Sequence, residues 1–135
     1  HETTRADMVQ AVLEGVAFAL RDSFEMARRN GLAPTRSSLC GGGAKSPLWR
    51  EILANVLGIP LDTLETEQGA SFGAAILAMV GCGVFVSVQE ASGALTKVKS
   101  TVAPHADLQR RYEQRYQTFQ KIYPRVKGLF PCLHQ

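Results

Sequence analysis

The sequence predicts an α/β fold in which short parallel strands carry packed helices, with a further helix near the C-terminal end. Three observations predict it. Helix-like and strand-like segments alternate along the 135 residues. Glycine and proline stand at the segment boundaries, and three glycines separate the first expected strand from the helix that follows. Such alternation is typical of parallel strands with helices against the sheet.

The first element is a helix over about residues 5–30. Thr4 and Asp7 have the spacing of a capping pair, and Gly31 after Asn30 can end the helix in the left-handed conformation. Its apolar residues follow helical spacing and predict one wide core-facing stripe: Met8, Val9, Val12, Leu13, Val16, Ala19, Leu20, Phe24 and Ala27.

A short buried strand over residues 37–40 comes next and leads into Gly41-Gly42-Gly43. A second helix then starts at Pro47 with Ser46 as its N-cap, and Gly58 closes it. Its apolar face contains Leu48, Trp49, Ile52, Leu53, Val56 and Leu57. Residues 59–64 predict a second short strand with a proline near its start, where the missing N–H is tolerated.

The remaining segments are mostly helical. A turn over residues 67–71 opens a third helix that ends at Gly81, and because this helix is apolar all round we expect burial on most sides. Residues 88–91 predict a short helical turn. The last helix covers about residues 107–123, with Pro124 bending or breaking it. Its apolar face is Leu108, Tyr112, Tyr116, Phe119 and Tyr123.

Composition limits the function. Apolar residues make up 45% and charged residues 20%, a globular balance, and no apolar run is long enough to cross a membrane. The chain has neither a starting Met nor a signal peptide, which suggests a piece of a longer protein. Cys40, Cys82 and Cys132 are too scattered for a disulfide framework or a metal site and predict free thiols in a reducing cytoplasm.

The net charge of +3 is uneven, because residues 97–127 hold eight basic and two acidic side chains. A basic helix can bind nucleic acid. Charges of this kind more often form a solvated face or pair with acidic surface elsewhere, so we expect no nucleic-acid partner. Two short strands would leave unpaired edges, which predicts self-association, for example as a homodimer.

The glycine run is the strongest chemical feature. Glycine lets a backbone turn sharply and approach a ligand, and the following helix N-terminus favours phosphate. Ala44 in place of glycine before Lys45-Ser46 excludes a P-loop, and the dinucleotide pattern lacks its third glycine. The spacing favours a nucleotide over the other reading, a glycine turn needed only for tight packing.

Residues 39–50, LCGGGAKSPLWR, resemble the adenosine-binding motif of the FGGY carbohydrate kinases, in the form that xylulose kinases use. Residues 69–78 and 83–85 resemble later parts of the same proteins, and residues 7–14 are similar to the end of the family's second signature. The resemblance implies part of a ribonuclease-H-like, actin-like ATPase domain, with residues 1–135 forming a C-terminal ATP-binding portion that lacks the N-terminal sugar-binding domain.

The resemblance further implies a cytoplasmic kinase that moves the γ-phosphoryl group of ATP, bound with Mg²⁺, onto D-xylulose. Gly41, Gly42 and Gly43 would bind ATP or ADP near the ribose and phosphates, and Ser46 would lie near the adenosine. Family relatives that act on glycerol tend to carry Asn at the position of Ser46. The family's base and sugar-binding residues lie upstream of His1, so no residue here is assigned as catalytic and the chain alone is expected to be inactive.

Two other functions stay open. The whole protein would be another FGGY kinase acting on gluconate, ribulose or a related polyol, or the chain would be a non-catalytic interaction module. For Trp49, core packing is favoured over adenine stacking, and Lys45 fits either phosphate binding or a solvated loop. Glu14 is expected to be a surface charge, Gly73 to allow close helix packing, and His1, His105 and His134 to bind no metal.

Overall fold

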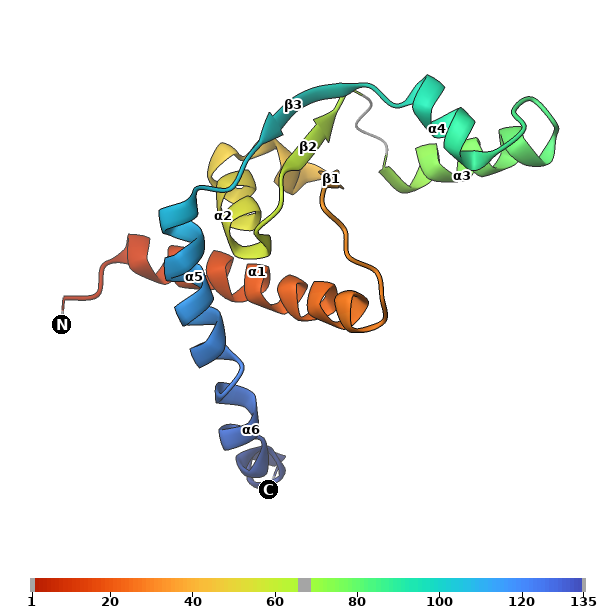
Figure 1. Cartoon of the computed structure of the whole chain (residues 1–135). Coiled ribbons are helices and arrows are strands. Elements are labelled where there is room, and N and C mark those ends of the chain that lie inside the picture. The colour runs from red at the N-terminus through yellow and green to blue at the C-terminus, as the bar shows by residue number, and fades with distance from the viewer. Residues whose placement is uncertain (1, 66–68, 135) are drawn as a thin grey trace.

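Helix α2 (Pro47–Leu57) lies at the centre of the structure, a computed structural model that describes residues 2–65 and 69–134. The Ser46 Oγ caps the helix by accepting a hydrogen bond from the Trp49 amide at 3.3 Å. Gly58 ends it with φ of 69°, as expected. Residues 52–57 are all buried, because α2 packs against α1, α5 and the sheet on different sides (Figure 1).

Helix α1 (Arg5–Arg29) has the predicted ends: Thr4 and Asp7 form a capping box, and Gly31 has φ of 83°. The predicted core stripe is largely wrong. The fully buried residues are Ala17 and Phe18, while much of the expected stripe is exposed: Met8, Val9, Val12, Val16 and Leu20. The helix is apolar on two faces, and α2 and α5 cover only one of them.

The sheet has three strands in the order β1–β2–β3: β1 (Ser37–Leu39), β2 (Leu61–Leu64) and β3 (Val98–Val102). The predicted strand pair is confirmed and parallel, with Ser37 opposite Leu61. Strand β3 was not predicted, and it runs antiparallel to β2 with Ser100 opposite Thr63. Strand β1 is half-buried to exposed instead of buried, since it lies at an edge of the described sheet.

Helices α3 (Gly69–Gly81) and α4 (Val88–Leu95) form a pair that lies apart from α1, α2 and α5 (Figure 1). Residues 88–91, where we expected a short helical turn, are the first half of α4, which continues to Leu95. Of the turn expected at residues 67–71, residues 67 and 68 lie outside the described residues, and residues 69–71 already belong to α3. The expectation that α3 is buried on most sides is wrong, because Ile76 is its one buried residue and α4 is its main described neighbour.

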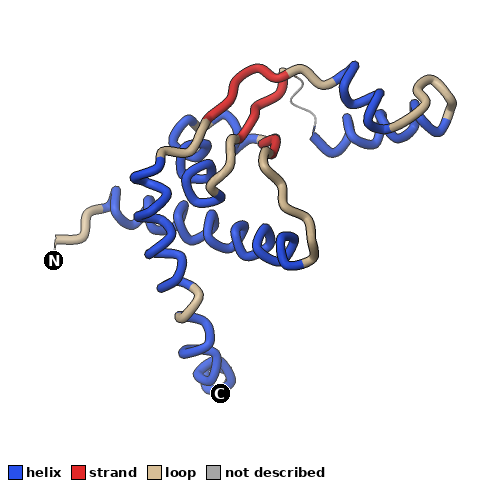
Figure 2. The backbone as a smooth tube through the Cα atoms, in the orientation of Figure 1, coloured by secondary structure: helices blue, strands red, loops and turns tan. Residues whose placement is uncertain are grey.

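The last predicted helix is divided into α5 (Ala106–Phe119) and α6 (Ile122–Val126), followed by the 3₁₀ segment η2 (Lys127–His134); Figure 2 shows the break. The helix ends before Tyr123 because Pro124 has no amide hydrogen to donate to Gln120 and its ring would clash with that carbonyl. Pro124 instead occupies the first turn of α6, where no donor is needed.

The core lies where α1, α2, β2 and α5 meet. Phe18 packs between the rings of Tyr112, Tyr116 and Phe119, with centroid distances of 5.4–6.2 Å. The buried residues of the core are Ala17, Phe18, Ile52, Leu53, Ala54, Val56, Leu57, Ile59, Leu61, Tyr112 and Tyr116.

Polar contacts join α1 to α5. Glu14 is not a surface charge, because its side chain is 12% exposed and pairs with Arg115 at 2.7 Å. The Tyr116 hydroxyl donates to Asp22 at 2.6 Å. Burial, followed by the hydrogen bond to Asp22, raises the pKa of Tyr116 to about 12. Part of the basic C-terminal charge is thus paired with acidic groups on α1.

No helix within residues 2–65 and 69–134 is both long and apolar enough to cross a membrane.

Candidate functional site

The glycine loop follows β1 directly and folds into a short 3₁₀ turn, η1 (Gly42–Lys45). The turn is held by hydrogen bonds from the Ala44 amide to the Gly41 carbonyl and from the Ser46 amide to the Gly43 carbonyl, each 3.1 Å. Since β1 and β2 are parallel, this loop lies at the carboxyl end of both strands, where open α/β sheets bind ligands.

The three glycines differ in what their positions require. Gly41 has φ of 83°, a conformation that residues with a Cβ adopt at a cost. A Cβ on Gly43 would lie 3.0 Å from the indole ring of Trp49, which packs against the core as expected. Gly42 has neither constraint, because a Cβ there would meet nothing within 4 Å. Backbone conformation therefore explains Gly41 and packing explains Gly43, whereas Gly42 is left without a structural reason.

The amides that could bind an anion come from η1 more than from α2. Pro47 has no N–H, and the Trp49 amide is already capped by Ser46. The first N–H groups of a helical turn, here those of Gly42 and Gly43, have no partner within that turn. We expected the start of α2 to supply the donors for phosphate. In the structure, the glycine turn η1 offers more such donors than the start of α2 does.

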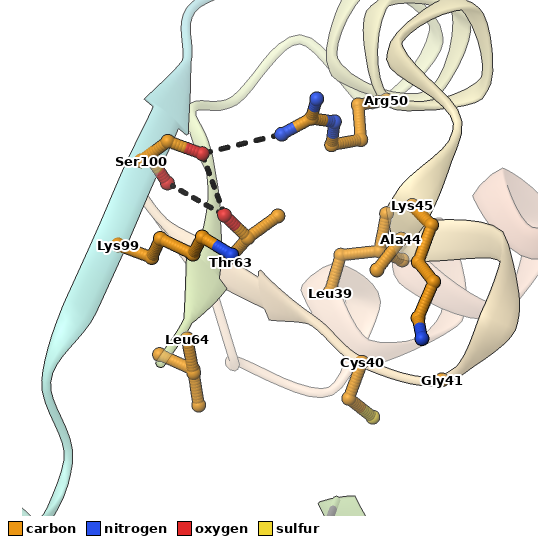
Figure 3. Close-up of a pocket in the computed structure, with 10 residues that line it drawn as sticks. All are labelled: Leu39, Cys40, Gly41, Ala44, Lys45, Arg50, Thr63, Leu64, Lys99 and Ser100. Atoms are coloured by element: carbon orange, nitrogen blue, oxygen red, sulfur yellow. Dashed lines mark hydrogen bonds between the residues drawn. The ribbon is translucent and has the colours of Figure 1, made fainter. Parts of the chain in front are cut away.

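A cavity of about 350 Å³ lies beside the loop, between η1, α2 and the sheet (Figure 3). Of the predicted site residues, Gly41 lines it, whereas Gly42, Gly43 and Ser46 lie in the adjoining turn and cap. Its lining consists of Leu39, Cys40, Gly41, Ala44, Lys45, Arg50, Thr63, Leu64, Lys99 and Ser100.

Sequence reasoning did not single out the polar residues at the far end of this cavity. Arg50 donates through Nη1 to the Ser100 hydroxyl at 3.2 Å, and that hydroxyl lies 2.6 Å from the Thr63 hydroxyl (Figure 3). Arg50 stood within the recognised motif, four residues after Ser46. Lys99 and Ser100 could not be found, because they belong to the unpredicted strand β3.

The aspartates have structural partners. Asp7 caps α1, Asp22 accepts the Tyr116 hydroxyl, and the Asp62 carboxylate is buried beside Arg36 at 2.5 Å. The expectation that Gly73 allows close helix packing is wrong for the described residues, because a Cβ placed there would meet nothing within 4 Å. The backbone amide of His105 donates to Asn55, and among the described residues no group of three His, Cys, Asp or Glu side chains could hold a metal ion.

Fold and loop together define an α/β structure with a glycine turn at the carboxyl ends of its parallel strands. Residues 1–82 match the C-terminal domain of the FGGY family of carbohydrate kinases. The chain belongs to this family, and the fold agrees: the structure of xylulose kinase from Rhodospirillum rubrum superposes with a TM-score of 0.79 at 30% identity, over 99% of this chain and 27% of that one.

Two curated relatives illustrate the range of names. A xylulose kinase of Staphylococcus epidermidis is 36% identical over 126 residues, covering 93% of this chain and 25% of the relative. An L-xylulose/3-keto-L-gulonate kinase of Escherichia coli is 31% identical over 125 residues, covering 93% of this chain and 25% of the relative. The chain thus spans about a quarter of the length of the curated relatives that it matches.

Proposed function

We propose that this chain is the nucleotide-binding portion of a sugar kinase that transfers the γ-phosphoryl group of ATP, entering with Mg²⁺, to D-xylulose. The observation that carries the proposal is Gly42, a glycine with no packing requirement in a turn at the carboxyl end of the sheet. The match of residues 1–82 to the kinase family supports the same assignment.

Each predicted site residue receives a role in this proposal. Gly41 makes the turn, and the backbones of Gly42 and Gly43 approach the ribose and phosphates because no Cβ intervenes. Ser46 lies beside the adenosine while capping α2. Phosphoryl transfer depends on positioning and charge neutralisation, and on a base that accepts the hydroxyl proton. We assign no such base to this chain, so transfer would need residues that lie outside it.

D-Xylulose is the preferred acceptor because relatives named xylulose kinase match nearly the whole chain. The second candidate is another sugar or polyol that an FGGY kinase phosphorylates, because one relative is named for L-xylulose and 3-keto-L-gulonate. A cytoplasmic location and a homodimeric partner stay predictions.

The test replaces Gly42 with valine in the complete kinase. Because a Cβ here would meet nothing beyond its chain neighbours within 4 Å and φ is not left-handed, we expect the fold to survive. We expect ATP and ADP to bind at least about tenfold more weakly, a loss of about 1.4 kcal/mol, with D-xylulose affinity unchanged. Paired calorimetric titrations with ADP and D-xylulose measure both affinities.

Gly93→Val is the matched control, since Gly93 on α4 is equally open and lies outside the glycine loop. Unchanged ADP affinity in Gly42→Val would remove the loop from the nucleotide site. Equal weakening of ADP and sugar would mean a general disturbance of the fold. A variant that only melts earlier, in a protein that binds no nucleotide, would favour the interaction module.

A further inference from the structure

Gly69, the first residue of α3, lies directly beside Cys40, the residue that joins β1 to the glycine loop. A Cβ placed on Gly69 would lie 2.5 Å from the Cys40 Sγ and 3.1 Å from the Cys40 Cβ. Non-bonded heavy atoms are in good contact at about 3.5–4.0 Å, so both separations are too short. Because the φ of Gly69 is not left-handed, this contact, and not its own backbone conformation, requires a glycine.

The Cys40 side chain cannot relieve this clash alone. Rotation about its Cα–Cβ bond would move the Sγ to another staggered position, but it would leave the Cβ where it is. The 3.1 Å separation of the two Cβ atoms would remain, and it can grow only if the backbone of Cys40 or of α3 moves. A side chain at position 69 therefore displaces backbone as well as one thiol.

The backbone of Cys40 leads straight into the glycine loop. Cys40 precedes Gly41 and lines the cavity beside the loop, whereas Gly69 does not line it (Figure 3). A second close approach holds the other end of the loop, because a Cβ on Gly43 would lie 3.0 Å from the Trp49 side chain. The loop is thus confined between the start of α3 and helix α2, and Gly42 lies between the two confined ends.

We propose that Gly69 is a positioning residue for the glycine loop. Because it has no side chain, Cys40 can lie against the start of α3, and this contact fixes the position of the turn that follows Cys40. The consequence for nucleotide binding rests on the proposed function, in which the backbone of this turn approaches the ribose and phosphates. The competing explanation is a glycine that only lets α3 start close to β1, without effect on the loop.

The test is Gly69→Ala in the complete kinase. We expect ADP to bind about fivefold more weakly, because small displacements of positioned groups are costly, and we expect D-xylulose affinity to be unchanged. In steady-state kinetics, the KM for ATP should rise by more than kcat falls.

Truncation of Cys40 should reverse this loss in two steps. Cys40→Ala removes the Sγ and should restore part of the ADP affinity, whereas Cys40→Gly removes the Cβ as well and should restore all of it. Calorimetric titrations with ADP compare each double variant with its own Cys40 single variant.

Gly73→Ala is the matched control, since it makes the same change one turn further along α3, where a Cβ would meet nothing within 4 Å. It should leave ADP affinity unchanged. Unchanged ADP affinity in Gly69→Ala would overturn the positioning role. A loss that neither Cys40 variant reverses, or an equal loss for ADP and sugar with a lower melting temperature, would overturn it as well.

A second measurement does not depend on nucleotide. In the isotope-labelled 135-residue chain without ligand, Gly69→Ala should shift the amide NMR resonances of Gly42 and Gly43, and the shift should vanish in the Cys40→Gly background. If the unmodified kinase binds no ADP, the proposed function fails, and these resonances alone decide whether Gly69 positions the loop. Unmoved loop resonances would overturn the inference even in a kinase that binds ADP.

Discussion

Gly41 is the residue of the glycine run whose backbone itself requires glycine, since its φ is 83°. We expect Gly41→Ala to lower the free energy of unfolding by about 1–2 kcal/mol, because a Cβ clashes with the backbone in this conformation. Gly42→Ala should be neutral or raise it by up to about 1 kcal/mol by restricting the unfolded chain. Urea unfolding of both variants checks this; equal destabilisation would show that Gly42 is also constrained.

Asp62 makes the stability of the sheet depend on pH. Its Oδ2 lies 2.5 Å from Arg36 Nε, and Thr101 donates to its Oδ1 at 2.6 Å. The hydrogen bond from Arg36 holds the pKa of the Asp62 carboxyl below its ordinary value in the folded state. Its contribution is therefore complete above the unfolded pKa of about 3.9 and is lost as pH falls through the lower folded pKa.

We expect Asp62→Asn to lower stability near neutral pH and to flatten the loss of stability in acid below about pH 5. Thermal melts across that range measure both effects. Asp107→Asn is the comparison, since that carboxylate is exposed on α5 and its ion pair with Arg110 should contribute little. An unchanged acid profile in Asp62→Asn would show that the pair with Arg36 does not stabilise the sheet.

At the scale of elements, Ser46 joins the glycine turn to α2 by capping the helix. We expect Ser46→Ala to destabilise the chain by about 1 kcal/mol and Ser46→Asn to be close to neutral, because Asn is also a good N-cap. Thermal melts measure both, with Ser87→Ala at the cap of α4 as a comparison outside the loop. A loss of ADP affinity in Ser46→Asn at unchanged stability would separate the nucleotide contact from the cap.

Strand β3 is the element that sequence reasoning missed. Only its two ends are apolar, and none of its residues is buried, so it lacks the alternation that marks a half-buried strand. It forms because β2 offers an open edge with which it pairs antiparallel. This pairing brings Lys99 and Ser100 to the cavity, so the missed strand also hid part of the candidate site.

At the scale of the whole molecule, exposed apolar side chains lie outside the core, both on the uncovered part of α1 and on α3. Val12 on α1 is 66% exposed and Leu77 on α3 is 61% exposed. Together with the open edges of β1 and β3, these surfaces predict self-association of the chain. We expect light scattering to report a mass above that of the monomer, rising with concentration.

Val12→Glu combined with Val16→Glu should reduce this association and leave the melting temperature nearly unchanged, since both side chains are exposed and outside the core. Leu13→Glu is the contrasting variant, because Leu13 packs against the core and its change should unfold the chain. A monomer at all concentrations in the unmodified chain would contradict the prediction.

The sequence by itself determined the features that depend on neighbours along the chain. The caps at Thr4 and Ser46, the left-handed ends at Gly31 and Gly58, the first two strands and the glycine turn are all set by local backbone chemistry. The family resemblance rested on these same local motifs.

Only the tertiary structure decided which face of α1 is covered, where β3 pairs, and that Arg50, Thr63 and Ser100 meet at one cavity. An apolar stripe shows that a helix can be buried but not on which side, because burial requires a partner from another part of the chain. In the same way, the sequence alone presents Arg50 as an ordinary charged residue on a helix. The tertiary structure shows that it donates to Ser100 of β3, and that its Nε is buried without a hydrogen-bond partner among the described residues.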